Sequence, residues 1–175
     1  MHSTFFITFE NDIVNMKNKT IDYILRATWQ AVSRMYNEEA NKYEATMATG
    51  FALLSIDREE GTPSTALGPR MGMEATSLTR TLKSMEEKGL IIRKKNPEDG
   101  RGVLIYLTDF GKEKRELSKN TVLKFNESVR QHVSEEKINN FIEVAEIINE
   151  LIQNKTIFNS HAGSDENAAI QDSKN

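Results

Sequence analysis

The 175-residue sequence contains no cysteine, and this absence excludes disulfide bonds, thiolate metal ligands and cysteine-based nucleophiles or redox sensors. No run approaches the roughly 18 apolar residues that a membrane-spanning helix needs, and no lysine or arginine precedes the apolar patch Phe5–Ile7. We therefore expect no membrane partner, no secretory signal and a cytoplasmic location. His2, His132 and His161 are too scattered to predict a metal site.

The sequence also lacks the common motifs of catalysis. It has no GxxxxGK[ST] phosphate-binding loop, no GxGxxG after a strand and no HExxH. The paired carboxylates Glu59–Glu60, Glu86–Glu87 and Glu135–Glu136 lie at predicted helix ends or exposed positions, where hydration is their usual role. We therefore expect neither an enzyme nor a cofactor.

Positive charge is concentrated in one segment, although the whole chain has a formal net charge of −3. Residues 70–101 contain eight cations and five anions, so the rest of the chain carries a larger net negative charge than the chain as a whole. A locally basic surface on an acidic protein favours an anionic partner. With 38% hydrophobic residues, the chain is long enough to bury one core.

Residues 74–90, EATSLTRTLKSMEEKGL, predict a short helix with two different faces. Ala75, Leu78, Leu82 and Met85 recur at the spacing of a single buried stripe. The opposite face carries hydroxyls and cations, namely Thr76, Ser77, Thr79, Arg80 and Lys83. Near a helix N-terminus such side chains can contact base edges and phosphates. An ordinary hydrated face has the same composition, so the flanking elements must decide between the two interpretations.

A β-hairpin is predicted directly after this helix. Residues 90–95 and 103–107 have strand-like patterns, and the turn-forming segment Asn96–Gly100 lies between them. The expected tip carries the charged residues Lys94, Lys95, Asp99 and Arg101. Asp99 can pair with Arg101 and hold the tip.

Helices are predicted on both sides of this segment. One extends from Thr20 to about Tyr43, and a second follows Thr46. A third begins at Thr62–Pro63, and Gly68–Pro69 is expected to kink or end it. Met16, just before the first helix, is a candidate translation start.

Two longer helices are predicted after the hairpin, with Thr108 and Ser134 as their N-caps. The last helix carries more apolar residues than one packing contact requires: Ile138, Phe141, Ile142, Val144, Ala145, Ile147, Ile148, Leu151 and Ile152. We expect a second copy of the chain to cover this surface.

The order of a short helix, a turn, a two-faced helix and a basic hairpin resembles the core of MarR-family transcriptional regulators. The resemblance rests on Leu78-Thr79-Arg80, Glu86–Leu90, Asp99-Gly100-Arg101, and Leu107-Thr108 followed by Gly111. The flanking helices follow the order of that family from about Thr20 to Leu151. The implied fold is mostly α with a small β-hairpin wing, a winged helix-turn-helix within a helical dimerisation scaffold of about six helices.

The sequence patterns and the resemblance together divide the chain into five segments. The aperiodic N-terminus and the small, polar C-terminus predict a flexible N-terminal arm (1–18) and a disordered tail (159–175). Between them the resemblance implies an N-terminal dimerisation helix (19–45), a winged helix-turn-helix DNA-binding domain (46–108) and C-terminal dimerisation helices (109–158). The implied function is a sequence-specific DNA-binding transcriptional regulator, a ligand-responsive repressor that binds a pseudo-palindromic operator as a homodimer. Its partners would be double-stranded DNA, a second copy of the chain and a small apolar or aromatic effector. The alternative is a winged-helix module for protein contact without sequence-specific DNA binding.

Site residues follow from the matched positions. Thr76, Ser77, Thr79 and Arg80 would face bases or phosphates, and Arg101 of the wing would enter the minor groove. Lys83, Lys94, Lys95 and Arg70 are expected at phosphates, which position a protein without reading sequence. Trp29, Tyr36 and Phe51 are candidates for an effector pocket, although core packing is the more common role of such residues.

Overall fold

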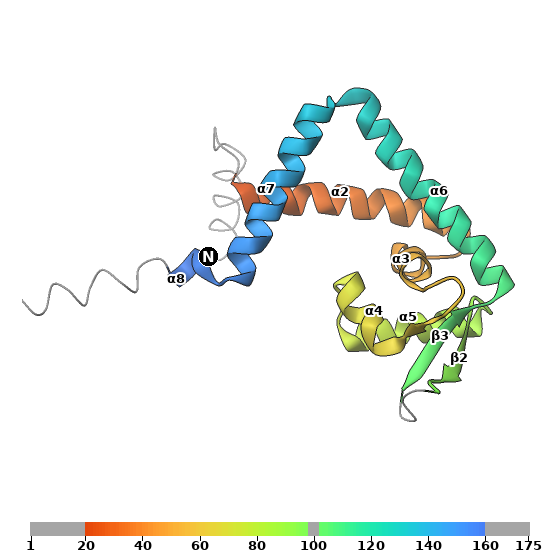
Figure 1. Ribbon diagram of the computed structural model, residues 1–175. Coiled ribbons are helices and arrows are strands. Elements are labelled where there is room, and N and C mark those ends of the chain that lie inside the picture. Colours follow the sequence, from red (N-terminus) through yellow and green to blue (C-terminus); the bar gives the residue numbers. More distant parts are fainter. Residues whose placement is uncertain (1–19, 98–101, 160–175) are drawn as a thin grey trace, which may run out of the picture. The chain divides into compact units, whose positions relative to one another are not determined.

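The computed structural model describes residues 20–97 and 102–159 (Figure 1). These residues form seven helices and three short strands, which confirms the predicted class of a mostly α fold with a small β-hairpin wing. They divide into two compact units whose boundary lies between Val122 and Leu123, within one long helix. We call residues 20–122 the winged unit and residues 123–159 the second unit. No helix among the described residues is long and apolar enough to cross a membrane.

The winged unit begins with one long helix and continues with three shorter ones and a sheet. Its elements are α2 (Ile21–Asn41), α3 (Met47–Ser55), β1 (Thr62–Pro63), α4 (Ser64–Met71), α5 (Ala75–Glu87), β2 (Ile91–Lys95), β3 (Val103–Leu107) and the first part of α6 (Asp109–His132). The second unit contains the rest of α6, α7 (Glu135–Gln153) and the short α8 (Thr156–Asn159), which the sequence did not predict.

The core of the winged unit lies between its helices and its sheet. The strands are antiparallel in the order β1-β3-β2, with Ile91 paired to Leu107 and Lys95 to Val103. The buried residues come from each surrounding element: Ala52, Leu53, Ile56, Leu67, Leu78, Leu82, Met85, Leu90, Ile91, Ile105 and Leu107. This shared core holds α5 against the sheet.

The predicted start of the third helix is wrong. Thr62 and Pro63 form β1, where they pair with Ile105 and Leu104 of β3, and α4 begins one residue later. Thr62 is only 1% exposed, and its hydroxyl accepts a hydrogen bond from the backbone N–H of Asp57 at 2.8 Å. Pairing with β3 therefore takes precedence over the local capping preference of Thr62.

Pro69 does not end α4, so the expectation that Gly68–Pro69 kinks or ends the helix is wrong for the helix end. The helix continues to Met71 and terminates at Gly72, which has a left-handed conformation with φ of 58°. The N–H of Met73 then donates to the carbonyl of Gly68 at 3.0 Å, which closes the helix end. The turn before α5 is therefore set by Gly72.

The start of α6 lies directly against the segment between α5 and β2. Thr108 caps α6 by accepting a hydrogen bond from the N–H of Gly111 at 2.9 Å, as the sequence predicted. Its backbone N–H donates to the carbonyl of Leu90 at 3.1 Å, and its hydroxyl donates to that of Gly89 at 2.6 Å. These bonds bring Gly111 so close to Leu90 that a Cβ at position 111 would lie 1.9 Å from the Leu90 carbonyl oxygen.

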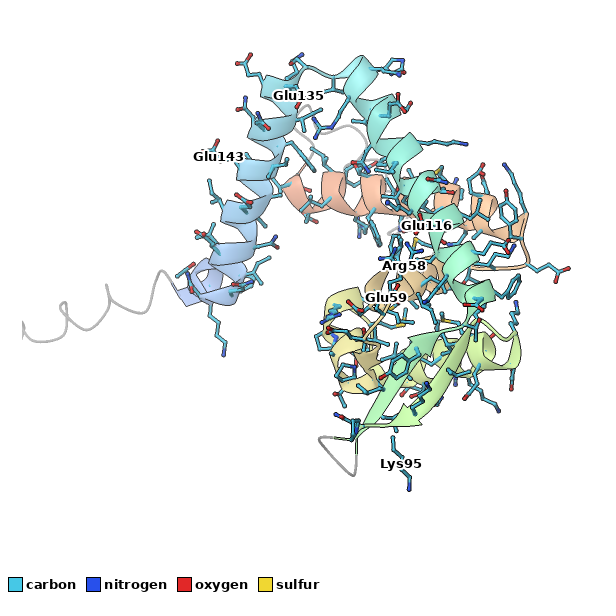
Figure 2. All side chains as sticks on the ribbon, turned by 45° about the vertical axis from the view of Figure 1, so that its right-hand side comes forward. Arg58, Glu59, Lys95, Glu116, Glu135 and Glu143 are labelled. Atoms are coloured by element: carbon cyan, nitrogen blue, oxygen red, sulfur yellow. The ribbon has the colours of Figure 1, made fainter. Side chains whose placement is uncertain are left out.

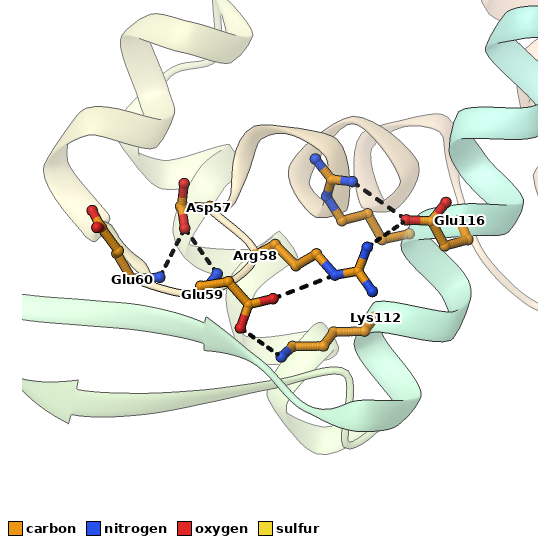
Figure 3. A network of polar contacts seen from close by, with 7 residues as sticks. Asp57, Arg58, Glu59, Glu60, Lys112 and Glu116 are labelled. Carbon is orange, nitrogen blue, oxygen red and sulfur yellow. Dashed lines mark hydrogen bonds and ion pairs between the residues drawn. The ribbon is translucent and has the colours of Figure 1, made fainter.

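A polar network joins the loop before β1 to α6. Arg58 and Glu59 of the loop lie beside Glu116 of α6 in Figure 2, and Figure 3 shows their contacts. The Arg58 guanidinium is 3.5 Å from the carboxylate of Glu116, and Lys112 is 3.4 Å from that of Glu59. The backbone N–H groups of Glu60 and Glu59 donate to Asp57, and these bonds lower the pKa of its carboxyl group. The network therefore joins this loop to the first part of α6 through exposed ion pairs.

The second unit leaves its apolar side chains uncovered within one chain. Ser134 caps α7 as predicted, by accepting a hydrogen bond from the N–H of Lys137 at 3.4 Å. None of the residues of α7 is buried, and Phe141 is 63% exposed. The other large exposed hydrophobic residues of this unit are Leu123, Val129, Ile142, Val144, Ile147, Leu151, Ile152, Ile157 and Phe158.

Candidate nucleic-acid interface

Helix α5 presents a polar face because its apolar face is anchored in the core. Leu78, Leu82 and Met85 are buried against the neighbouring elements of the winged unit. Ala75, which the sequence placed on the same stripe, is exposed as the first residue of the helix. The residues predicted to face DNA are all exposed: Thr76, Ser77, Thr79, Arg80 and Lys83.

The polar face of α5 offers both acceptors and cations. The Thr79 hydroxyl donates to the carbonyl of Ala75 at 2.8 Å, so its oxygen can still accept a hydrogen bond. Within the described part of the chain, Arg80 has no ion-pair or hydrogen-bond partner, so its full set of donors is available. Lys83 is 3.9 Å from Glu87, a distance at which an exposed pair contributes little.

The hairpin strands place further cations beside α5. The Lys94 ammonium lies 4.8 Å from the centre of the Tyr106 ring, which supports it at the sheet surface. Lys95 is exposed at the end of β2, where Figure 2 shows its side chain extending away from the sheet. Asp99 and Arg101, predicted for the wing tip, lie outside the described residues.

Two arginines near the interface have contacts that the sequence did not reveal. Arg93 of β2 is 2.9 Å from the carboxylate of Glu86 in α5, an ion pair that joins the wing to the last turn of that helix. Arg70, predicted at a phosphate, donates to the carbonyl of Ser55 at 3.1 Å and so connects α4 to the end of α3. No local pattern signals either pairing, because each requires elements that meet only in the folded chain.

A cavity of about 320 Å³ lies within the winged unit, between α3, the C-terminal end of α2 and the first half of α6. Tyr36 and Phe51 both line it, with their rings 5.8 Å apart in an edge-to-face arrangement. Burial raises the pKa of the Tyr36 hydroxyl. Trp29, the third predicted pocket residue, is 53% exposed and lies outside the lining. Other lining residues that the sequence did not single out include Leu54, Lys88, Leu90, Phe110 and Leu117.

The arrangement of α4, a tight turn, α5 and a β-hairpin defines a winged helix-turn-helix, the class in which the second helix of the motif enters the major groove of DNA. Residues 45–103 match the model of the MarR family. The chain is also 33% identical over 103 residues to the organic hydroperoxide resistance transcriptional regulator of Bacillus subtilis strain 168, an alignment that covers 58% of this chain and 70% of the relative. The chain belongs to the MarR family, and it is a DNA-binding transcriptional regulator.

Solved structures share the fold. The MepR–DNA complex of S. aureus has a TM-score of 0.70 at 18% identity, and the match covers 77% of this chain and 100% of MepR. The PcaV regulator of Streptomyces coelicolor, in complex with its natural ligand, has a TM-score of 0.65 at 18% identity, covering 79% of this chain and 94% of PcaV. At these identities the likeness establishes the fold alone.

Proposed function

We propose that this protein is a ligand-responsive repressor that binds a pseudo-palindromic operator as a homodimer. The observation that carries the proposal is the outward face of α5, on which hydroxyls surround Arg80 while the opposite face is buried in the core. This geometry suits a recognition helix, since short hydroxyls and an arginine can reach base edges in the major groove. A chromosomal target implies a cytoplasmic protein.

The proposed residues have two roles: some read the base sequence, and others position the protein on the DNA backbone. Thr76, Ser77, Thr79 and Arg80 face the bases or the adjacent phosphates. Lys83, Lys94, Lys95 and Arg70 contact phosphates, and Arg70 does so with the donors that its bond to Ser55 leaves available. Asp99 and Arg101 lie outside the described residues; the role we propose for Arg101 is entry into the minor groove, and the role we propose for Asp99 is pairing with that arginine.

The proposed dimer follows from the uncovered helices. An amphipathic helix with no buried residue is not stable as an isolated surface element, because its apolar side chains remain in water. A second copy supplies matching apolar surface through a two-fold interface. Two recognition helices then reach half-sites about one turn apart, roughly 34 Å, on one face of the duplex.

We assign the cavity beside Tyr36 and Phe51 to the effector, because its lining is mainly apolar and it touches both α2 and the end of α5. An apolar or aromatic small molecule fits this chemistry. One relative is named for organic hydroperoxide resistance. Since this chain has no cysteine, thiol oxidation is excluded as its own switch.

Selection of bound sites from random double-stranded DNA by the purified protein tests this function. We expect a motif with two-fold symmetry whose half-sites lie one helical turn apart, and binding that weakens steeply as salt is raised. Retention without any sequence enrichment and without salt dependence would instead favour a winged helix used for protein contact.

Replacing Arg80 by alanine should weaken binding to the selected operator by about 1 to 3 kcal/mol and affect random DNA less, because a bidentate contact to a guanine is lost. Lys83→Ala, on the same helix, is the matched comparison and should weaken both DNAs by similar factors. Fluorescence anisotropy with the two duplexes measures both effects. An Arg80→Ala loss that is equal on the two DNAs would reassign Arg80 to a phosphate.

A further inference from the structure

The last turn of the recognition helix reaches the edge of the cavity through Lys88. This residue caps the C-terminal end of α5, where its backbone N–H donates to the carbonyl of Ser84 at 3.1 Å. Its ammonium group donates to the backbone carbonyl of Glu44, 44 residues earlier in the turn between α2 and α3. Both Lys88 and Glu44 line the cavity.

The partner carbonyl belongs to a turn with an unusual backbone. Glu44 has φ of 53°, in the left-handed region that residues other than glycine rarely adopt. The N–H of Glu44 donates to the carbonyl of Asn41, and that of Ala45 donates to the carbonyl of Ala40, both at 3.1 Å. These two hydrogen bonds fix the conformation of the turn, and in this conformation the Glu44 carbonyl faces the Lys88 ammonium group.

Two lysines line the cavity, and their surroundings differ. Lys114 lies 3.2 Å from the carboxylate of Glu113 and 4.9 Å from the centre of the Phe110 ring. Among the described residues, Lys88 has no carboxylate partner, and its contact is to a neutral carbonyl. A carboxylate is a stronger acceptor for an ammonium group than a neutral carbonyl.

We propose that Lys88 is a positioning residue that couples the cavity to the recognition helix. Its bond to Glu44 holds the C-terminal end of α5 against the turn between α2 and α3. When a ligand with an apolar body and a carboxylate group binds in the cavity, its carboxylate pairs with the Lys88 ammonium group, and the hydrogen bond from Lys88 to the Glu44 carbonyl is lost. Helix α5 then loses the orientation that DNA binding needs. This inference rests on the proposed function for its consequence at DNA, but the contact itself is testable without DNA.

The first test measures operator affinity against salt for full-length Lys88→Met, Lys88→Arg and Lys83→Met. We expect Lys88→Met to bind about threefold more weakly, the range of one exposed hydrogen bond. Its salt slope should equal that of the wild type, and Lys88→Arg should restore the affinity. Lys83→Met should reduce the slope by about 1.8, because the homodimer loses one phosphate contact at each of its two half-sites. A reduced slope in Lys88→Met, or an unchanged affinity, would overturn the positioning role.

The second test uses hydrogen exchange in the free protein. In Lys88→Met the amides of Lys88, Gly89 and Ala45 should exchange faster, while the melting temperature stays close to that of the wild type. Unchanged exchange at these amides refutes the coupling contact. If the wild type failed to select an operator, the proposed function would fail, but this measurement would still report on the contact.

The third test uses 2-naphthoate as the probe and the uncharged 2-naphthalenemethanol as its matched control. We expect 2-naphthoate to weaken operator binding by the wild type, the alcohol to have less effect, and Lys88→Met to respond equally to both compounds. No difference between the two compounds on the wild type would overturn the competition for the Lys88 ammonium group.

Discussion

Replacing Gly111 by alanine should destabilise the winged unit by about 3 kcal/mol or more, the upper range for overpacking a close-packed site. The added Cβ would lie 1.9 Å from the oxygen and 3.0 Å from the carbon of the Leu90 carbonyl. Neither side can yield easily, because Thr108 bonds to the carbonyls of both Gly89 and Leu90 and also caps α6. The new methyl group must therefore separate α6 from the segment that follows the recognition helix.

Chemical denaturation followed by circular dichroism measures this effect, and Gly50→Ala is its matched control. Gly50 lies within α3, where a new Cβ would meet the Ser118 hydroxyl at 3.4 Å, an ordinary contact. Removing a helix-interior glycine there should leave stability unchanged or raise it by about 0.5 to 1 kcal/mol. Equal unfolding midpoints for the two variants would show that Gly111 of α6 does not lie in close contact with the Leu90 carbonyl.

Placing charge on α7 should abolish the dimer. The full-length double variant Phe141→Lys/Ile152→Lys puts two ammonium groups where the proposed partner would bury apolar side chains, which are 63% and 57% exposed in the single chain. We expect the dissociation constant to rise at least a thousandfold, about 4 kcal/mol, since an unpaired buried charge is costly. Operator affinity should fall with it, because each monomer retains only one half-site contact.

Analytical ultracentrifugation over a range of concentrations measures the dissociation constant, and Asn139→Lys/Gln153→Lys, on the polar side of α7, is the control with the same change of charge on the same helix. The control should remain dimeric. Truncation before Ser134 should also remove the dimer. A truncated protein that is still a dimer, or a wild type that is monomeric at high concentration, would contradict the proposed assembly.

Periodicity and local chemistry determined much of this protein. The stripe of Leu78, Leu82 and Met85 predicted which face of α5 is buried, and therefore which face is exposed. The caps Thr108 and Ser134 mark two helix starts because a side-chain hydroxyl bonds a backbone N–H only three residues away. Such signals are readable from the sequence because the groups that interact are neighbours along the chain.

Tertiary structure decided what depends on distant partners. Thr62 and Pro63 became a strand because β3, some 40 residues later, pairs with them, and no local pattern contains that information. Of three candidate aromatic residues, Tyr36 and Phe51 line the cavity and Trp29 does not, since helix packing determines which side chains converge. The contact between Lys88 and Glu44 has the same origin. The sequence alone therefore specified the two faces of α5, whereas folding placed the last turn of this helix beside a cavity.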